Sequence, residues 1–161
     1  MTKTEKKYRS LYDEKDHMLM KLLQRDGRIP IRRLAKKVDL SVDTTRKRIK
    51  RLIETGAIDR IGAFINPFVV GFPLIVDVKI KTLFTSAQDK KQFIDALDAH
   101  PNVSQVSTIM GGYDFTCVIV VKNPEEFEAV SAGIRQKFHA VIIDWVAFTV
   151  TGVHKIEEYP L

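Results

Sequence analysis

The feature that most constrains the fold of this chain is the stretch of residues 41–56, SVDTTRKRIKRLIETG. It begins with a serine that can cap a helix and ends with a glycine that can terminate one. Between them, apolar residues recur with the period of a helix and fall on one stripe at about 100° per residue. This stripe consists of Val42, Thr45, Ile49, Leu52 and Ile53. The sequence therefore predicts an amphipathic helix that packs on a core along this stripe.

The opposite face of this predicted helix is polar and basic. Residues 43–53 contain five Lys and Arg against one acidic residue. A solvated charged face is the ordinary interpretation of such a run, but the excess of one sign favours a polyanion as partner. Cations and small polar groups on an exposed helix face are suited to the DNA major groove. We therefore expect this helix to contact DNA.

The charge is also segregated along the chain. Residues 1–60 contain 18 Lys and Arg against 9 Asp and Glu, whereas residues 61–161 contain 8 against 11. A basic module joined to a mildly acidic one is typical of a nucleic-acid-binding domain attached to a part with another task. A membrane surface would also attract cations. The apolar stripe, however, lacks the Trp and Phe of an interfacial helix, so we expect no membrane partner.

Length and cysteine content set further bounds. A chain of 161 residues can form one ordinary domain or two small ones. No apolar run approaches the length of a membrane span, and the polar N-terminus leads into no secretory signal. Cys117 is the only cysteine, which fits a reducing cytoplasm, and we interpret it as a small core residue in a strand. We expect a cytoplasmic protein, with residues 1–11 as a flexible extension.

Two more helical patterns precede the helix predicted over residues 41–56. Acidic residues at 13–16 form a cap for the first, and Asp26-Gly27 ends it. Pro30 suits the first turn of the second, and residues 39–40 leave only a tight turn after it. Helix, short helix, tight turn and helix is the helix-turn-helix arrangement. We expect this domain to span residues 12–60.

The residues after this domain predict a connection to a second one. Residues 57–65, AIDRIGAFI, alternate like a strand with one apolar face. We expect a linker strand over residues 61–71, because the hydrophobic period changes again at Phe72.

From Phe72 onward, alternating and helical patterns follow one another. Strands are expected over residues 76–81, 103–110, 113–121 and 141–153, and helices after Ser86 and Asn123. Gly111-Gly112 predicts a hairpin between the second and third strands. The order β-α-β-β-α-β is that of a ferredoxin-like fold, expected over residues 72–161. The fold class of the chain is thus α+β.

One strand pattern has a consequence for assembly. Residues 115–121, FTCVIVV, are apolar on both faces. Two helices can cover only one face of a four-stranded sheet, so something else must cover the other. Self-association is the economical cover, and a symmetric dimer is the default oligomer. Such a dimer would bring two DNA-reading helices to one palindromic site.

Residue type and position assign roles on the predicted DNA-reading helix. Lys47, Lys50 and Arg51 can neutralise phosphates, which makes affinity fall steeply with salt. Asp43, Thr44 and Lys47 lie near the helix start, where side chains reach base edges. Sequence contacts are therefore expected at the first turns of the helix and phosphate contacts along its length.

Both domains carry the residue patterns of one known family. The matching stretches are residues 13–28, 34–41 and 48–58, and VSTIMGGYDF at 106–115, which contains the family's Gly-x-Tyr/His-Asp-Tyr/Phe element. Through them the chain resembles the Lrp/AsnC (feast/famine) family of prokaryotic transcription regulators over roughly residues 12–155. The resemblance implies a winged helix-turn-helix and a ferredoxin-like domain of the RAM type. In the family, this second domain dimerises, assembles dimers into octamers or similar rings, and often binds a free amino acid between subunits.

The resemblance also extends the set of DNA-binding residues. Arg28 and Arg48 match basic family positions, which implies contacts to the DNA backbone. Arg46 flanks the apolar stripe and joins the set. The predicted DNA-binding residues are Arg28, Asp43, Thr44, Arg46, Lys47, Arg48, Lys50 and Arg51.

The hairpin offers a candidate effector site. Gly111-Gly112 can bring backbone N–H groups to a carboxylate, and Asp114 can accept an α-ammonium. A tight hairpin needs the same glycines, and Asp114 can equally hold the turn, so both interpretations stay open. Hydroxyls of the last strand are expected to face the same cleft. The predicted effector-binding residues are Met110, Gly111, Gly112, Tyr113, Asp114, Thr149 and Thr151.

Two other functions stay open. An architectural DNA-binding protein with little sequence preference has the same charge and fold. Siroheme decarboxylases share this fold and resemble the chain at residues 60–63, but they carry His- and Arg-containing elements near the hairpin, where this chain has MGGYD. The four histidines show no metal spacing, and no phosphate loop is present. We therefore expect no enzyme, no metal and no other cofactor, and favour a sequence-specific transcription regulator modulated by an amino acid.

Overall fold

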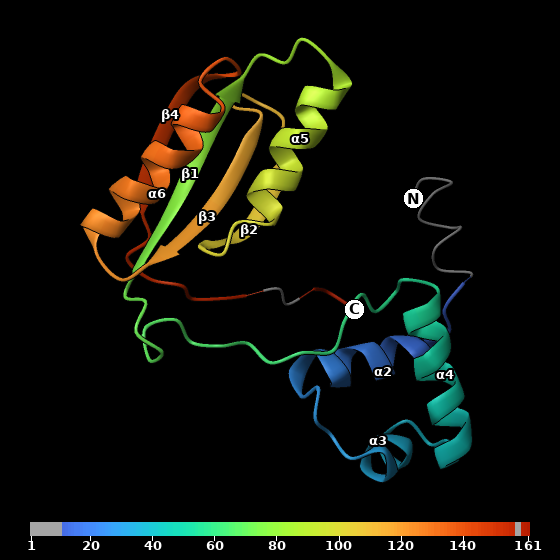
Figure 1. Ribbon diagram of the computed structural model, residues 1–161. Coiled ribbons are helices and arrows are strands. Elements are labelled where there is room, and N and C mark those ends of the chain that lie inside the picture. Colours follow the sequence, from blue (N-terminus) through green and yellow to red (C-terminus); the bar gives the residue numbers. More distant parts are fainter. Residues whose placement is uncertain (1–10, 157–158) are drawn as a thin grey trace. The chain divides into compact units, whose positions relative to one another are not determined.

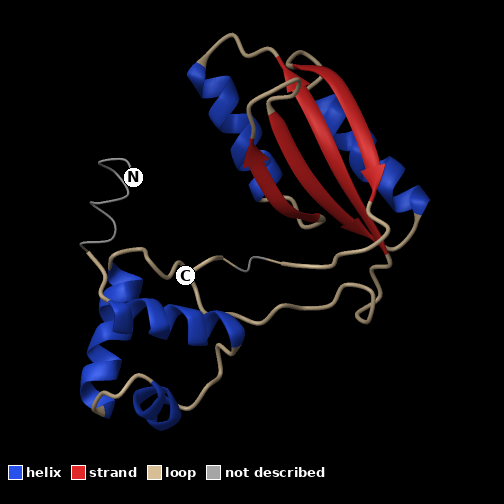
Figure 2. Cartoon of the chain, turned by 180° about the vertical axis from the view of Figure 1, so that it is seen from behind, coloured by secondary structure: helices blue, strands red, loops and turns tan. Residues whose placement is uncertain are grey.

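The structure is a computed structural model that describes residues 11–156 and 159–161, and these residues form two compact units (Figures 1 and 2). One unit contains the described residues up to Phe64 and those from Lys155, and the other contains Ile65–His154. None of the described helices is long and apolar enough to cross a membrane. The extension expected over residues 1–11 lies outside the described residues, except for the exposed Leu11.

The N-terminal unit is built from helices. They are α2 (Glu14–Arg25), α3 (Ile31–Lys37) and α4 (Val42–Glu54). Asp13 caps α2 by accepting the N–H of Asp16. Ser41 caps α4 by accepting the N–H of Thr44. In the tight turn between α3 and α4, Asp39 adopts φ 53°, a left-handed conformation that Asp tolerates better than most residues. The predicted helix-turn-helix is confirmed.

Buried leucines hold these helices together. Leu19 of α2, Leu34 of α3 and Leu52 of α4 are all excluded from solvent and belong to one cluster. Burying one such side chain is worth roughly 1.5–3 kcal/mol. This cluster therefore fixes how α4 is oriented on the unit.

The second unit is an antiparallel sheet with helices on one face. Along the chain it contains β1 (Leu74–Thr82), α5 (Ala87–Asp98), β2 (Val103–Thr108), β3 (Phe115–Val121), α6 (Pro124–Lys137) and β4 (Ile142–Thr149). The strand order is β2-β3-β1-β4. Figures 1 and 2 are taken from opposite sides, and α5 and α6 lie in front of the sheet in the first and behind it in the second. The predicted ferredoxin-like order is confirmed.

The core of this unit lies between the sheet and its two helices. Phe93 of α5 makes edge-on ring contacts with Phe115 of β3 and with Phe138, at centroid distances of 5.3 and 5.1 Å. Cys117 of β3 is buried in the same cluster, which confirms its interpretation as a core residue. Since side chains alternate along a strand, every second residue of β1 and β3 points away from this core.

These outward residues form a second face of the sheet. The open sheet face includes Ile75, Asp77, Lys79, Lys81, Thr116, Val118, Val120, Asp144, Val146 and Phe148. At its centre, Lys79 donates to Asp77 at 2.7 Å and to Thr116 at 2.9 Å. Phe148 lies opposite Asp77 in the strand register and is 53% exposed. The face therefore combines a paired charge with apolar side chains.

The strand expected over residues 57–65, and the linker strand over 61–71, are absent from the described chain. Residues 57–73 consist of turns, bends and irregular backbone. The alternating pattern predicts an extended backbone, but a strand also needs a neighbour that satisfies its N–H and C=O groups. No strand of the sheet pairs with this segment, and Phe64 stays 69% exposed. The prediction was wrong because it considered the segment without a partner.

Candidate DNA-binding surface and effector region

α4 is fixed by one face and exposes the other. Thr45 and Leu52 are fully buried, and the Thr45 hydroxyl donates to the Ser41 carbonyl at 2.9 Å. The buried stripe is narrower than predicted, because Ile53 is 44% exposed. The core contacts α4 along the line through Thr45, Ile49 and Leu52, whereas the flank that carries Ile53 remains in solvent.

The first turns of α4 expose the residues that the sequence assigns to base contacts. Asp43, Thr44 and Lys47 are all exposed. Thr44 accepts a hydrogen bond from the Ser41 hydroxyl at 2.8 Å, which orders its side chain at the helix start. Among the described residues, Lys47 forms no ion pair, so its ammonium group is available to an external anion.

Two other cations of α4 form exposed ion pairs within the helix. Arg46 lies 3.3 Å from Asp43, and Lys50 lies 3.5 Å from Glu54. All four side chains are mostly exposed, and ion pairs of this kind contribute about 0–1 kcal/mol. An incoming phosphate can therefore replace either acid at little cost.

Arg48 and Arg51 are held differently. Arg48 donates to Asp13 at 2.7 Å and to Asp16 at 2.9 Å, and Arg51 donates to the second oxygen of Asp16. The Arg48 guanidinium holds the pKa of Asp13 below its usual range. The carboxylates of Asp13 and Asp16 in turn raise the pKa of Arg48. Both arginines are predicted DNA-binding residues, but periodicity did not predict these contacts, because Asp16 lies in another helix and Asp13 caps that helix.

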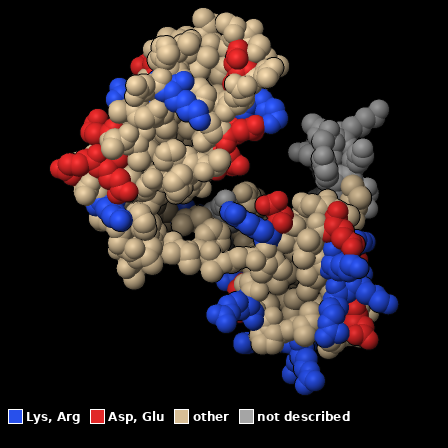
Figure 3. Space-filling model, in the orientation of Figure 1, with Lys and Arg blue, Asp and Glu red and all other residues tan. Residues whose placement is uncertain are grey.

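The remaining predicted DNA-binding residue lies before α3. Arg28 is exposed, and its backbone N–H donates to the Asp26 carboxylate at 3.0 Å. On the face seen in Figure 3, Lys and Arg side chains gather over the helix-turn-helix unit. The basic charge of residues 1–60 thus appears at the surface of this unit rather than inside it.

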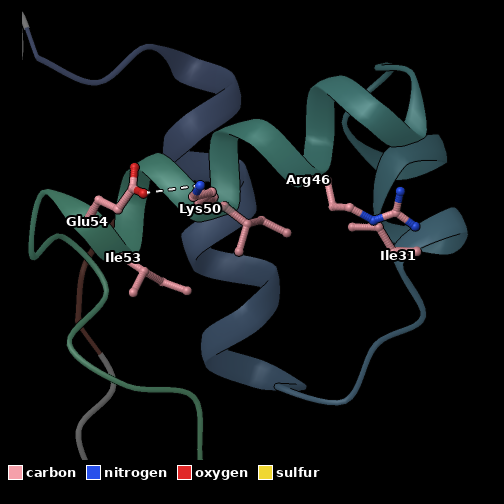
Figure 4. Close-up of a pocket in the computed structure, with 6 residues that line it drawn as sticks. Ile31, Arg46, Lys50, Ile53 and Glu54 are labelled. Atoms are coloured by element: carbon pink, nitrogen blue, oxygen red, sulfur yellow. Dashed lines mark ion pairs between the residues drawn. The ribbon is translucent and has the colours of Figure 1, made fainter.

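A shallow hollow of about 520 Å³ lies along the flank of α4 (Figure 4). Ile31 of α3 lies beside Arg46 at one end, and Ile53 lies with the Lys50–Glu54 pair at the other. Ile53 is exposed to solvent because its side chain lines this hollow. The lining of the hollow excludes Asp43, Thr44 and Lys47, so it is separate from the residues that the sequence assigns to base contacts.

In the second unit, the predicted hairpin is present, because β2 pairs antiparallel with β3, but its loop is longer than predicted. β2 ends at Thr108 and β3 begins at Phe115, and the Ile109 N–H donates to the Asp114 carbonyl at 2.8 Å. Gly111 adopts φ 147° within this loop, which a residue with a side chain rarely does. Met110 is fully exposed. The two glycines lie in the middle of the loop instead of forming a two-residue turn.

Asp114 is already satisfied by its own chain. Its carboxylate accepts the Thr82 N–H at 2.8 Å and the Thr82 hydroxyl at 3.2 Å, and it pairs with Lys81 at 3.3 Å. The Thr82 N–H and, after it, Lys81 lower the pKa of Asp114. Of the two roles left open by the sequence, this geometry matches holding the loop against β1.

Asp144 and Lys81 also belong to this region, although neither is among the predicted effector-binding residues. The Tyr113 hydroxyl donates to Asp144 at 3.2 Å, and Asp144 pairs with Lys81 in the register of β1 and β4. The alternation of β1 placed Lys81 on an outward face. Nothing in the pattern indicated which strands are neighbours, so its proximity to the loop remained hidden.

The hydroxyls of the last strand do not join this loop within one chain. Thr149 pairs with Val76, whereas Asp144 pairs with Lys81 near the loop. Val76 and Lys81 are five residues apart along β1, which is about 17 Å at about 3.4 Å per residue. β4 runs antiparallel to β1 and carries Thr149, and Thr151 after it, away from the loop. The prediction of one shared cleft was wrong for the single chain.

Each of the two units matches a known protein family. The family described as winged helix-turn-helix DNA-binding matches residues 12–59. The family described as the Lrp/AsnC ligand binding domain matches residues 75–141. The helix-turn-helix and the ferredoxin-like sheet therefore occur together in the chain order typical of one class of regulator.

Individual proteins agree with this assignment. The HTH-type transcriptional regulator FL11 of Pyrococcus furiosus is 32% identical over 118 residues, which cover 73% of this chain and 76% of FL11. An AsnC family transcriptional regulator from Agrobacterium tumefaciens has a TM-score of 0.83 at 27% identity, covering 92% of this chain and 97% of that one. The transcriptional regulator NMB0573 of Neisseria meningitidis, in a complex with L-Met, has a TM-score of 0.81 at 19% identity, covering 92% and 96%. This chain belongs to the Lrp/AsnC family of helix-turn-helix transcriptional regulators and carries the family's ligand-binding domain.

Proposed function

We propose that this regulator binds a specific operator through α4, in the cytoplasm, and that a small amino acid bound by the second unit modulates its assembly and DNA binding. The observation that carries the proposal is the arrangement of α4. Thr45 and Leu52 anchor it on the core, while Asp43, Thr44 and Lys47 stand exposed at its first turns.

The chemistry of these side chains suits base recognition in the major groove. The Asp43 carboxylate can accept from a cytosine amino group, and Thr44 offers a hydroxyl and a methyl group. Lys47 can reach a guanine edge or a phosphate. Arg46 and Lys50 can exchange their exposed acids for phosphates, and Arg28 can contact the backbone ahead of α3.

The proposed effector site is the loop between β2 and β3. Gly111 and Gly112 leave backbone N–H groups accessible to a carboxylate, and Asp114 positions the loop by holding it to Thr82. The match to a ligand-binding domain supports this location. NMB0573 shares the fold and is in complex with L-Met, but at 19% identity the nature of its ligand does not transfer. The loop is open in the single chain, so the rest of the site would come from a neighbouring subunit.

Self-association completes the proposal. The apolar residues of the open sheet face, such as Val118 and Phe148, favour burial against a second copy. A dimer of this kind presents two α4 helices to a palindromic operator, and further assembly into a ring or octamer is proposed from the family resemblance. An amino acid that binds between subunits then favours one assembly state, which couples it to DNA binding.

The DNA-binding part is tested by measuring affinity for the duplex upstream of the protein's own gene and for a scrambled duplex, at one fixed, near-physiological salt concentration. A preference of about 10³ or more is expected for a specific regulator. Equal binding to the upstream and scrambled duplexes would favour the architectural alternative. Failure to bind either duplex would contradict DNA binding and return attention to a decarboxylase-like activity.

The effector part is tested by calorimetric titration of the full chain with each proteinogenic amino acid. The expected result is saturable binding of one or a few of them, together with a change in sedimentation and in operator affinity. A protein that binds none of them would remove the effector from the proposal and leave the DNA-binding part intact.

A further inference from the structure

A buried carboxylate in the first unit has no role in the function proposed above. Asp16 lies in the first turn of α2 with only 1% of its surface exposed. One carboxylate oxygen accepts from Arg48 at 2.9 Å, and the other accepts from Arg51 and from the Asp13 N–H. Arg48 also donates a hydrogen bond to the Asp13 carboxylate. The carboxylate of Asp16 in α2 and that of Asp13, the residue that caps α2, therefore hold two guanidinium groups of α4.

This cluster divides the five cations of α4 into three kinds. Lys47 forms no ion pair among the described residues, and Arg46 and Lys50 form exposed pairs that a phosphate can replace. Arg48 and Arg51 cannot leave Asp16 in the same way. A buried carboxylate without its cations costs several kcal/mol, so DNA would have to compensate for that cost before gaining a phosphate contact.

We propose that Asp16 is a positioning residue that withholds Arg48 and Arg51 from the phosphates of DNA. The proposal rests on the proposed function, DNA binding through α4. In this arrangement, α4 presents three cations to DNA instead of the five that its sequence contains. The two arginines stabilise the packing of α4 on α2. They do not add to the electrostatic attraction between α4 and the phosphates of DNA.

The consequence is a higher ratio of specific to non-specific binding. Non-specific affinity comes from the counterions that cations release from phosphates, and the slope of log K against log salt is about −0.9 for each phosphate neutralised. An arginine whose charge is compensated by a buried carboxylate releases none. Contacts to base edges from Asp43 and Thr44 do not depend on those arginines, so they survive while the background attraction is reduced.

The test compares D16N with D59N in the full chain. Both substitutions remove one negative charge, but Asp59 is exposed and lies outside the helices. Affinities for an operator duplex and a scrambled duplex are measured by fluorescence anisotropy between about 0.05 and 0.3 M salt. We expect D16N to steepen the salt slope by about 0.9 for each arginine released, and to tighten scrambled-duplex binding more than D59N does. Identical slopes for D16N and D59N would overturn the proposal.

A second pair of variants tests the same point with Asp16 in place, should D16N not fold. R51Q retains an N–H donor for Asp16 and removes a cation that the proposal withholds from DNA. K47Q removes the cation that forms no ion pair. We expect K47Q to flatten the salt slope by about 0.9 and R51Q to leave it nearly unchanged. An equal flattening of the salt slope in K47Q and R51Q would overturn the proposal.

The outcomes also separate this inference from the proposed function. If the wild-type chain prefers no duplex, specific recognition fails, but the slopes still measure what Asp16 does to non-specific binding. If the wild-type chain discriminates and D16N matches D59N, only this inference fails. A wild-type chain that binds neither duplex contradicts both.

Discussion

At the scale of single residues, burial decides the chemistry of Cys117. The side chain lies in the core between the sheet and its helices, and burial raises the pKa of its thiol to about 12. Since the thiolate is the reactive form, we expect the native protein to resist a thiol-specific reagent at neutral pH and to react fully after unfolding in denaturant. Absorbance of the released chromophore measures this. Rapid stoichiometric labelling of the native chain would contradict it.

Asp114 makes a pH-dependent contribution to stability. Its pKa is lowered in the folded chain by the Thr82 N–H and by Lys81. The contribution is therefore present above the usual Asp pKa of about 3.9 and is lost as the pH falls through the folded value. We expect D114N to lower the melting temperature at about pH 7 and to have a smaller effect near pH 3.

Thermal denaturation of wild type and D114N at the two pH values measures this difference. D98N serves as the control, because Asp98 is an exposed residue at the end of α5, and it should change the melting temperature little at either pH. If D114N lowers the melting temperature equally at both pH values, the charge of the carboxylate does not stabilise the loop.

At the scale of secondary-structure elements, caps set where helices begin. Ser41 accepts the Thr44 N–H at 3.1 Å in α4, and Ser86 accepts the Asp89 N–H at 3.0 Å in α5. Replacing either serine by alanine should cost about 1 kcal/mol. Only S41A should weaken DNA binding, because the first turn of α4 carries side chains that we propose to read bases.

The two cap variants are compared by thermal denaturation and by operator affinity in the same buffer. S86A controls for a general loss of stability, and its operator affinity should stay within about twofold of wild type. If S86A weakens DNA binding as much as S41A does, the start of α4 has no special role.

The sequence predicts where helices and strands lie better than it predicts which of them are in contact. Helix starts at Asp13, Ser41 and Ser86 and the alternation of β1 depend on neighbours within a few residues, so they were predicted correctly. The contact of Asp16 with Arg48 joins positions 32 residues apart. It depends on how α2 and α4 pack, which periodicity alone does not define.

The failed predictions have the same origin. Residues 57–65 have the alternation of a strand, but strand formation requires a partner that the pattern does not name. Thr149 was assigned to the loop of Asp114 because it is a hydroxyl residue of the last strand, and the pairing of that strand was not known. The antiparallel register of β4 places it at the other end of the sheet.

At the scale of the whole molecule, the open sheet face is expected to control assembly. Phe148 is 53% exposed in the single chain, and a carboxylate at its position would have to be buried without a partner in a dimer. We expect F148D to shift the protein to a monomer in sedimentation and to reduce its affinity for a palindromic operator. L83D is the control, because Leu83 is also an exposed apolar residue, at 65%, but lies in the loop after β1. An F148D protein that sediments like wild type would remove this face from the assembly.

The central claim is that α4 reads a DNA sequence. The most direct measurement is selection of duplexes from a random-sequence pool by the full chain, followed by affinity measurement of the selected and scrambled duplexes at fixed salt. The predicted result is enrichment of two related half-sites in inverted orientation, with a preference of about 10³ or more that T44A reduces. A pool that stays random, with every duplex bound equally, would contradict the claim.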